Sequence, residues 1–165
     1  MDDADDGEVS RAPELEDLIA LCRRLNDVEA RYLVIGGFAV ILHGFARGTK
    51  DIDLLVDPAP DNIALIRQAL SHLADNAVQD VRDSDLEDYP VVRVVDEIVV
   101  DLMAKACGID YREAASIGIQ SRQIEGVPIP IAGRELLIRT KQTIRPSDAA
   151  DVAFLSQGSD LVDED

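Results

Sequence analysis

The spacing of apolar residues predicts alternating helices and short strands in the first third of the chain. Residues 15–26 carry apolar side chains at helical intervals, and residues 32–35 are continuously apolar, as expected of a buried strand. Residues 38–43 form a short predicted helix that Gly44 ends, and residues 51–56 form the second predicted strand. The order expected here is therefore helix, strand, helix, strand.

The remaining pattern predicts two hairpins and four more helices. One helix is expected from its N-cap Asp61 to about residue 74. The other predicted elements are helices at 111–116, 134–144 and 147–155, a hairpin of strands 91–95 and 98–103 around Asp96-Glu97, and a smaller hairpin of strands 119–124 and 127–131. This order favours an α/β (α+β) fold, with a small twisted mixed β-sheet flanked by helices.

Chain length and charge distribution predict one folded domain between acidic ends. A chain of 165 residues with 47% apolar content lies within the usual range for one domain. The net charge of −17 is concentrated at the ends, since residues 1–18 carry eight acids against one base and residues 159–165 carry four acids and no base. We expect a disordered acidic tail at 1–12, a single domain at 13–157 with a helical part from about 133, and an acidic tail at 158–165.

Composition argues against several classes of protein. Broad nucleic-acid binding needs clustered Lys and Arg, and this chain has few. Cys22 and Cys107 lack metal-ligand spacing, so we expect buried, reduced thiols. No apolar run approaches the roughly 20 residues of a membrane span, and no signal peptide opens the sequence. We therefore expect a cytoplasmic protein without membrane contact.

Three aspartates interrupt otherwise apolar strands. Because strand side chains alternate, Asp51 and Asp53 share one face while Ile52 turns into the core. Asp101 lies within another apolar strand, where a charge is costly unless it is paired or binds metal. If the two strands are neighbours, the three carboxylates converge and suit two hard cations, Mg²⁺ or alternatively Mn²⁺, with Asp101 also able to accept a proton.

A glycine pair precedes these acids. Gly36 and Gly37 follow the first strand, and backbone N–H groups there can donate to phosphate oxygens without hindrance from a side chain. Arg47, Thr49 and Lys50 lie just before the second strand and can supply further donors. A glycine pair alone can be a turn, and Asp-x-Asp alone can end a strand by chance. The spacing of both with Asp101 favours a nucleotide and metal site.

This combination resembles the nucleotidyltransferase fold of the DNA polymerase beta-like superfamily. Its signature is a Gly-Gly or Gly-Ser pair, a spacer like the 13 residues from 38 to 50, Asp-x-Asp and a later lone Asp on a strand. The segment is most similar to small stand-alone prokaryotic members. Those members are related to antibiotic nucleotidyltransferases and to nucleotidyltransferases of toxin–antitoxin and abortive-infection systems.

The resemblance implies transfer of a nucleoside monophosphate from an NTP, with ATP as the expected donor. The acceptor would be a hydroxyl or phosphate, and pyrophosphate would leave. Asp51, Asp53 and Asp101 would hold two Mg²⁺ ions, while Gly36 and Gly37, together with Arg47 and Thr49, would bind the triphosphate.

The resemblance extends to the last two predicted helices. Lys141 is similar to a family residue that holds nucleotide phosphates, although Lys141 and Arg145 can also be a solvated pair beside Asp148 and Asp151. Arg145 is expected to pair with Asp148 or Asp151. Family members usually carry Lys before the residue at Asp148, where this chain has Pro-Ser.

The alternative function is an antitoxin-like or regulatory module that keeps the fold and binds a partner protein. A module that no longer catalyses a reaction would have no reason to keep three acids in apolar strands, so these acids argue against this alternative.

The acceptor is open between a small aminoglycoside-like molecule, a protein side chain and an RNA end. Residues 106–155 leave room for only a small acceptor domain, which favours a partner protein or a homodimer. His43 is expected to cap the preceding helix or interact with its dipole.

Overall fold

The computed structural model describes residues 10–143 and 145–157. The predicted acidic tails at 1–12 and 158–165 therefore lie largely outside the described residues. Just inside this range, the Arg11 N–H donates to the Glu97 carbonyl at 3.0 Å. No helix of the described part is long and apolar enough to cross a membrane.

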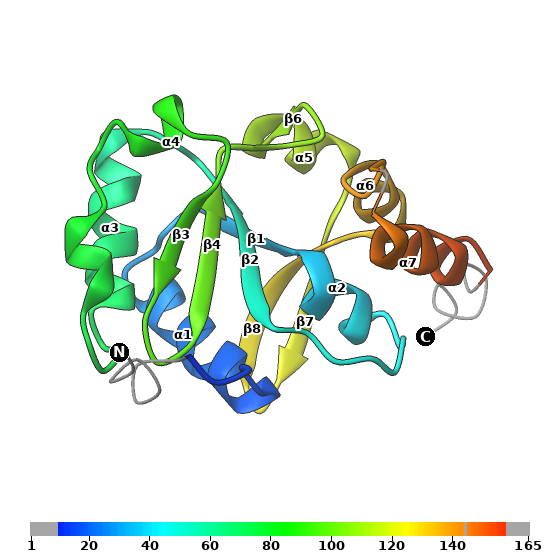
Figure 1. Ribbon diagram of the computed structural model, residues 1–165, viewed down its shortest axis with the longest axis horizontal. Coiled ribbons are helices and arrows are strands. Elements are labelled where there is room, and N and C mark those ends of the chain that lie inside the picture. Colours follow the sequence, from blue (N-terminus) through cyan, green and yellow to red (C-terminus); the bar gives the residue numbers. More distant parts are fainter. Residues whose placement is uncertain (1–9, 144, 158–165) are drawn as a thin grey trace, which may run out of the picture.

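A six-stranded mixed sheet forms the centre of the molecule (Figure 1). The spatial order is β3-β4-β2-β1-β8-β7, with bounds β1 Tyr32–Ile35, β2 Asp51–Val56, β3 Val92–Val95, β4 Val99–Met103, β7 Ile119–Ile124 and β8 Val127–Ala132. Strand β2 runs antiparallel to β1 and parallel to β4, and β1 runs parallel to β8. The predicted α/β fold with a mixed sheet is confirmed.

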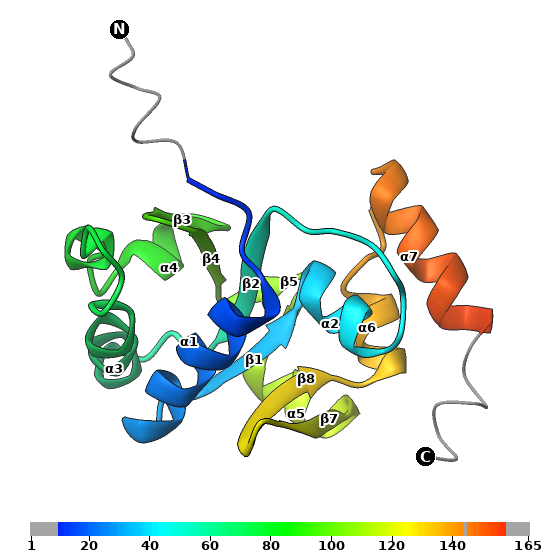
Figure 2. The ribbon, with the colours of Figure 1, turned by 90° about the horizontal axis from the view of Figure 1, so that it is seen from below.

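Helices pack beside this sheet and beyond its end (Figures 1 and 2). They are α1 Leu15–Asp27, α2 Gly36–Leu42, α3 Pro60–Leu70, α4 Asp85–Asp88, α5 Tyr111–Ile117, α6 Arg134–Arg139 and α7 Pro146–Gln157, with a 3₁₀ turn at Ala77–Asp80. A second sheet pairs β5 Lys105–Ala106 with β6 Ile109–Asp110. Helices α1 and α3 contact each other, and α6 contacts α7 at the far end from α3.

The apolar stripe of α1 explains how this helix joins the core. Leu18, Leu21 and Leu25 are fully buried among the sheet residues. Each buried leucine contributes about 1.5–3 kcal/mol relative to an exposed one. Glu14 and Asp17 form a capping box that starts the helix. The periodic pattern and the cap thus define the same helix.

Several predicted boundaries differ from the structure. Helix α2 begins at Gly36, so the glycine pair opens the helix and does not lie before it. Helix α3 begins at Pro60 with Ala59 as N-cap, because proline lacks the N–H that a first helical residue leaves unpaired. Asp61 lies in the first turn and pairs with Arg31. Helix α6 ends at Arg139 and not at 144, and the β3–β4 turn has three residues.

The buried Asp96 organises a segment that the apolar pattern does not predict. Its carboxylate accepts the N–H groups of Asp75, Ala77 and Glu97 at 2.7–2.9 Å. These bonds attach the chain after α3 to the β3–β4 turn. Backbone donors of this kind carry no periodic signal, which is why the segment was not predicted.

The prediction of two buried thiols is right for Cys22 and wrong for Cys107. Cys22 lies in the core, where burial raises the pKa of its thiol to about 12. Cys107 is exposed, with φ +48° next to Gly108 in the turn between β5 and β6. The position expected to be a strand end is therefore a surface turn.

Candidate active site

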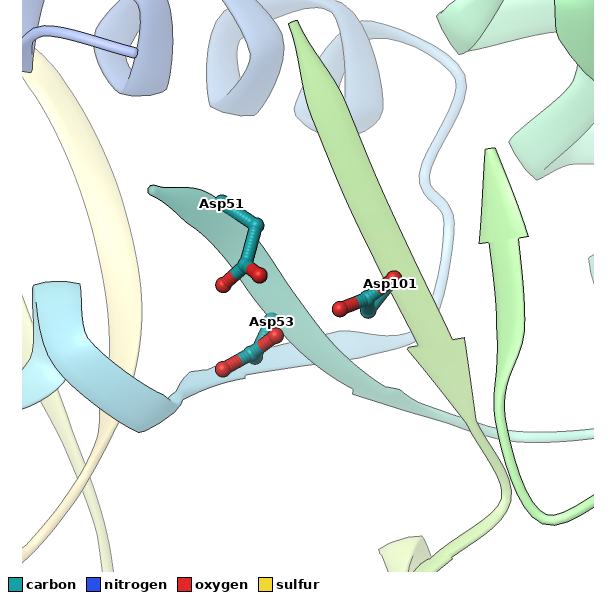
Figure 3. A group of neighbouring side chains, drawn as sticks. All are labelled: Asp51, Asp53 and Asp101. Atoms are coloured by element: carbon teal, nitrogen blue, oxygen red, sulfur yellow. The ribbon is translucent and has the colours of Figure 1, made fainter. Parts of the chain in front are cut away.

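Strand register brings three aspartates together (Figure 3). Strands β2 and β4 are parallel neighbours, and Asp53 pairs in register with Asp101. Asp51 lies two residues earlier on the same face of β2, while Ile52 is fully buried on the other face. One carboxylate oxygen from each aspartate lies within 4.8 Å of the other two. We call Asp51, Asp53 and Asp101 the acidic triad.

Electrostatics in the triad disfavour three charged carboxylates. Burial, reinforced by the negative charges of Asp51 and Asp101, raises the pKa of Asp53 to about 8. Burial and the charge of Asp51 also raise the pKa of Asp101, against the opposing effect of Arg93. Within the described part, Asp101 Oδ1 is buried and accepts no hydrogen bond. An acceptor of this kind costs free energy, and a bound cation would remove that cost.

Arg93 is a neighbour of the triad that the sequence reasoning missed. It pairs in register with Asp101 across β3 and β4, so both side chains lie on one face. Its Nη2 lies 3.0 Å from Asp101 Oδ2 and 3.4 Å from Asp51 Oδ2. The predicted two-residue turn pairs Arg93 with Val100, whereas the three-residue turn of the structure shifts the register by one residue and places Arg93 opposite Asp101.

The two glycines are required by close approach of side chains. Gly36 has φ +71°, and a Cβ there would lie 2.1 Å from Asp53 Oδ2. A Cβ on Gly37 would lie 2.5 Å from Arg47 Nη1 and 2.6 Å from Thr49 Oγ1. Any larger residue would therefore displace a triad member or the loop before β2. The glycines keep the first turn of α2 next to the acids.

A cavity of about 830 Å³ contains the triad. Its size falls within the roughly 300–1,000 Å³ of small-molecule sites. The predicted site residues all contribute to its lining: Gly36, Gly37, Arg47, Thr49, Asp51, Asp53, Asp101 and Lys141, together with Lys50 and Arg145. Three cations of this lining, Arg47, Lys141 and Arg145, form a basic wall in the same cavity as the triad.

That basic wall is held by two aspartates of α7. Lys141 Nζ lies 3.0 Å from Asp151 Oδ2 and 3.3 Å from Asp148 Oδ1. Arg47 Nε lies 3.0 Å from Asp151 Oδ1. Lys141 is 6% exposed, so the alternative of a solvated lysine is wrong. We call Arg47, Lys141, Arg145, Asp148 and Asp151 the α7 cluster.

Arg145 contacts Asp148, one of the two partners expected from the sequence. Its Nε lies 3.0 Å from Asp148 Oδ2. Burial opposes ionisation, but hydrogen bonds from Arg145 and Thr143 lower the pKa of Asp148. This carboxylate is charged in the ordinary pH range, unlike Asp53.

His43 has a different contact from the one expected. It ends α2, but its Nε2 lies 2.9 Å from the carbonyl oxygen of Ala132 at the end of β8. The buried ring thus links α2 to a neighbouring strand and does not line the cavity. This contact holds the end of α2 against the end of β8.

Comparison with protein families gives a match over residues 19–121. The matching model describes a nucleotidyl transferase AbiEii toxin of a type IV toxin–antitoxin system. The matched segment contains the glycine pair and the acidic triad, whereas α6 and α7 follow it. A search of curated proteins gives no significant match.

Solved structures share the fold at low sequence identity. A protein from Thermotoga maritima assigned as a nucleotidyltransferase superimposes with a TM-score of 0.57 and 16% identity, over 92% of this chain and 93% of that chain. An antigenic nucleotidyltransferase-like protein from Paracoccidioides brasiliensis gives a TM-score of 0.51 and 19% identity, over 88% of this chain and 77% of that chain. These similarities show a common fold.

Proposed function

Because the chain belongs to the AbiEii nucleotidyl transferase toxin family, we propose that it transfers a nucleoside monophosphate from an NTP to an acceptor. ATP is the first donor to test, the acceptor group is a hydroxyl or phosphate, and pyrophosphate is released. The observation that carries this proposal is the acidic triad, whose three carboxylates converge within 4.8 Å in the cavity beside Gly36.

The triad fits divalent cations such as Mg²⁺ or Mn²⁺. Asp51, Asp53 and Asp101 offer hard oxygen ligands, and the raised pKa of Asp53 reflects burial together with the charges of Asp51 and Asp101, which a cation would offset. When bound, two such ions supply Lewis-acid stabilisation of the attacking and leaving oxygens. Asp101 is the candidate base for the acceptor proton, since burial raises its pKa.

The triphosphate is proposed to lie along the first turn of α2 and the basic wall. Gly36 and Gly37 admit phosphate oxygens next to the backbone, because neither carries a Cβ. Arg47 and Lys141 line the same cavity and can donate charge-assisted hydrogen bonds. Thr49 Oγ1 lies beside Gly37 and adds a polar group there.

Calorimetric titration of ATP, CTP, GTP and UTP, with and without Mg²⁺, tests the proposal. The samples are wild type and the double variant Asp51→Asn/Asp53→Asn. Asp61→Asn/Asp83→Asn is the matched control, since it removes two carboxylates that do not line the cavity. We expect Mg²⁺-dependent binding to wild type and control, and its loss in the triad variant. Equal binding by all three proteins would contradict the site.

A second candidate function is that of a protein-binding module with the same fold. The type IV toxin–antitoxin description of the family supports a cognate antitoxin as the partner. Folded wild-type protein that binds none of the four NTPs would favour this candidate over the transferase. The identity of the acceptor stays open, and a homodimer and a cytoplasmic location stay predictions.

A further inference from the structure

Helix α7 contributes to the cavity although it follows the residues matched by the family model. It lies beside α6, at the end of the molecule where α2 and the loop before β2 are found (Figures 1 and 2). Two side chains on one side of α7, Asp151 and Phe154, contact that loop. Their spacing of three residues places them about one helical turn apart.

Asp151 joins two cations from distant segments. One oxygen lies 3.0 Å from Arg47 Nε in the loop, and the other lies 3.0 Å from Lys141 Nζ after α6. Asp151 is fully buried. Two cations so close together would repel each other without an anion between them. Asp151 therefore sets where both cations point into the cavity.

Phe154 provides an independent contact with the same loop. Its ring stacks on Phe45 with centroids 4.6 Å apart and an angle of 9° between the planes. Phe45 is two residues before Arg47, so the stack restricts the loop near its cation. Charge at Asp151 and apolar contact at Phe154 thus hold one loop by different forces.

We propose that Asp151 and Phe154 are positioning residues that hold Arg47 and Lys141 for the triphosphate. The inference rests on the proposed function and adds α7 to the site. Neither residue lines the cavity, so both act through the cations. A cation that is already held in place loses less conformational entropy when phosphate binds, and this increases affinity for the nucleotide. The contacts of Asp151 and Phe154 with Arg47, Lys141 and Phe45 do not include the three carboxylates of the triad.

The expected effects depend on which interaction each substitution removes. Asp151→Asn keeps the shape but removes the charge, and we expect the Kd of the Mg²⁺-NTP complex to rise about 10–100-fold, as for other residues that orient a binding group. Phe154→Leu removes only the aromatic stack, and a rise of about 2–10-fold is expected. Phe154→Tyr should restore wild-type affinity, since it keeps the ring.

Two calorimetric titrations test this role. The first measures binding of the NTP that wild type binds most tightly, with Mg²⁺. The second measures Mn²⁺ alone, whose Kd should stay unchanged in Asp151→Asn and Phe154→Leu because the triad is intact. Gln157→Ala, an exposed change on the same helix, is the control. Circular dichroism checks folding of each protein.

The outcomes separate this inference from the proposed function. Weaker NTP binding with unchanged Mn²⁺ binding supports the positioning role. Unchanged NTP affinity in both variants overturns it while the transferase proposal stands, and so does parallel loss of NTP and Mn²⁺ binding, which indicates a general structural role. Should Asp151→Asn fail to fold, Phe154→Leu decides alone. Wild type that binds no NTP overturns the proposed function and the positioning role together.

Discussion

The acidic triad and the α7 cluster both contain buried carboxylates, yet their electrostatics are opposite. In the triad, burial and neighbouring negative charges raise the pKa of Asp53 to about 8. In the α7 cluster, Asp151 and Asp148 each lie within 4 Å of two cations. Arg145 and Thr143 lower the pKa of Asp148 despite its burial. Burial opposes ionisation in both regions, and the neighbouring charges reinforce it in the triad but oppose it in the α7 cluster.

This difference indicates which region needs a ligand. In the α7 cluster, the cationic side chains compensate the charges of Asp148 and Asp151. The folded cluster is therefore stable without an added ion. The triad has Arg93 as its one ion-pair partner among the described residues, and that arginine is 57% exposed. A cation that binds only the folded triad therefore stabilises the protein by mass action.

Removal of Lys141 should give the largest change in stability. Lys141→Met leaves Asp148 and Asp151 buried with fewer cations, and loss of one partner of a buried pair costs about 3–5 kcal/mol. Urea unfolding at pH 7 measures the free energy of unfolding, with exposed Lys105→Met as the control. A loss below about 1 kcal/mol would contradict internal compensation in the α7 cluster.

Stability of the metal-free protein should fall as pH rises from 5 to 8. Folded Asp53 keeps its proton up to about pH 8, whereas the unfolded chain releases it near pH 4. The stabilising contribution is complete below the unfolded pKa and is lost as pH approaches the folded pKa, with a slope of up to about 1.4 kcal/mol per pH unit.

Urea unfolding in EDTA at several pH values measures this slope. Asp53→Asn should reduce it, because the amide binds no proton while Asp101 keeps a raised pKa, so the difference between the two proteins isolates Asp53. Excess Mg²⁺ should stabilise wild type most above pH 7, since metal binding displaces the proton. Parallel pH profiles for wild type and Asp53→Asn would show that the pKa of Asp53 is not raised in the folded protein.

Loss of Arg93 should have the smallest effect. Arg93→Gln removes the cation beside Asp51 and Asp101, but a side chain more than half exposed contributes at most about 1 kcal/mol. The pKa of Asp101 should rise further, since Arg93 lowers it. Carboxyl titration by NMR in EDTA measures this shift. An unchanged or lower pKa of Asp101 would show that Arg93 does not neutralise the triad.

The triad illustrates how far local patterns reach. Alternation along a strand put Asp51 and Asp53 on one face, and the apolar surroundings of Asp101 indicated a charge that needed a partner. Both arguments use neighbours in the chain, and the structure places the three acids together. The assumption that the two strands are adjacent came from outside this local pattern and depended on the resemblance to a known fold.

Other features had no local signal. The exposed Cys107 depends on a turn that forms only when β5 pairs with β6. Arg93 became a neighbour of Asp101 through strand register. The sequence does not decide between phosphate contact and solvent exposure for Lys141, because its burial depends on α7 folding against it.

The linear order of residues thus determined the apolar faces, the glycine pair and the acids of β2 and β4. These features follow from side-chain periodicity and backbone sterics, which act between residues close in sequence. Only the tertiary structure decided that Asp151 holds Arg47 and Lys141 together and that Phe154 stacks on Phe45. Coulomb attraction and ring contact act over a few ångströms of space, whatever the distance along the chain.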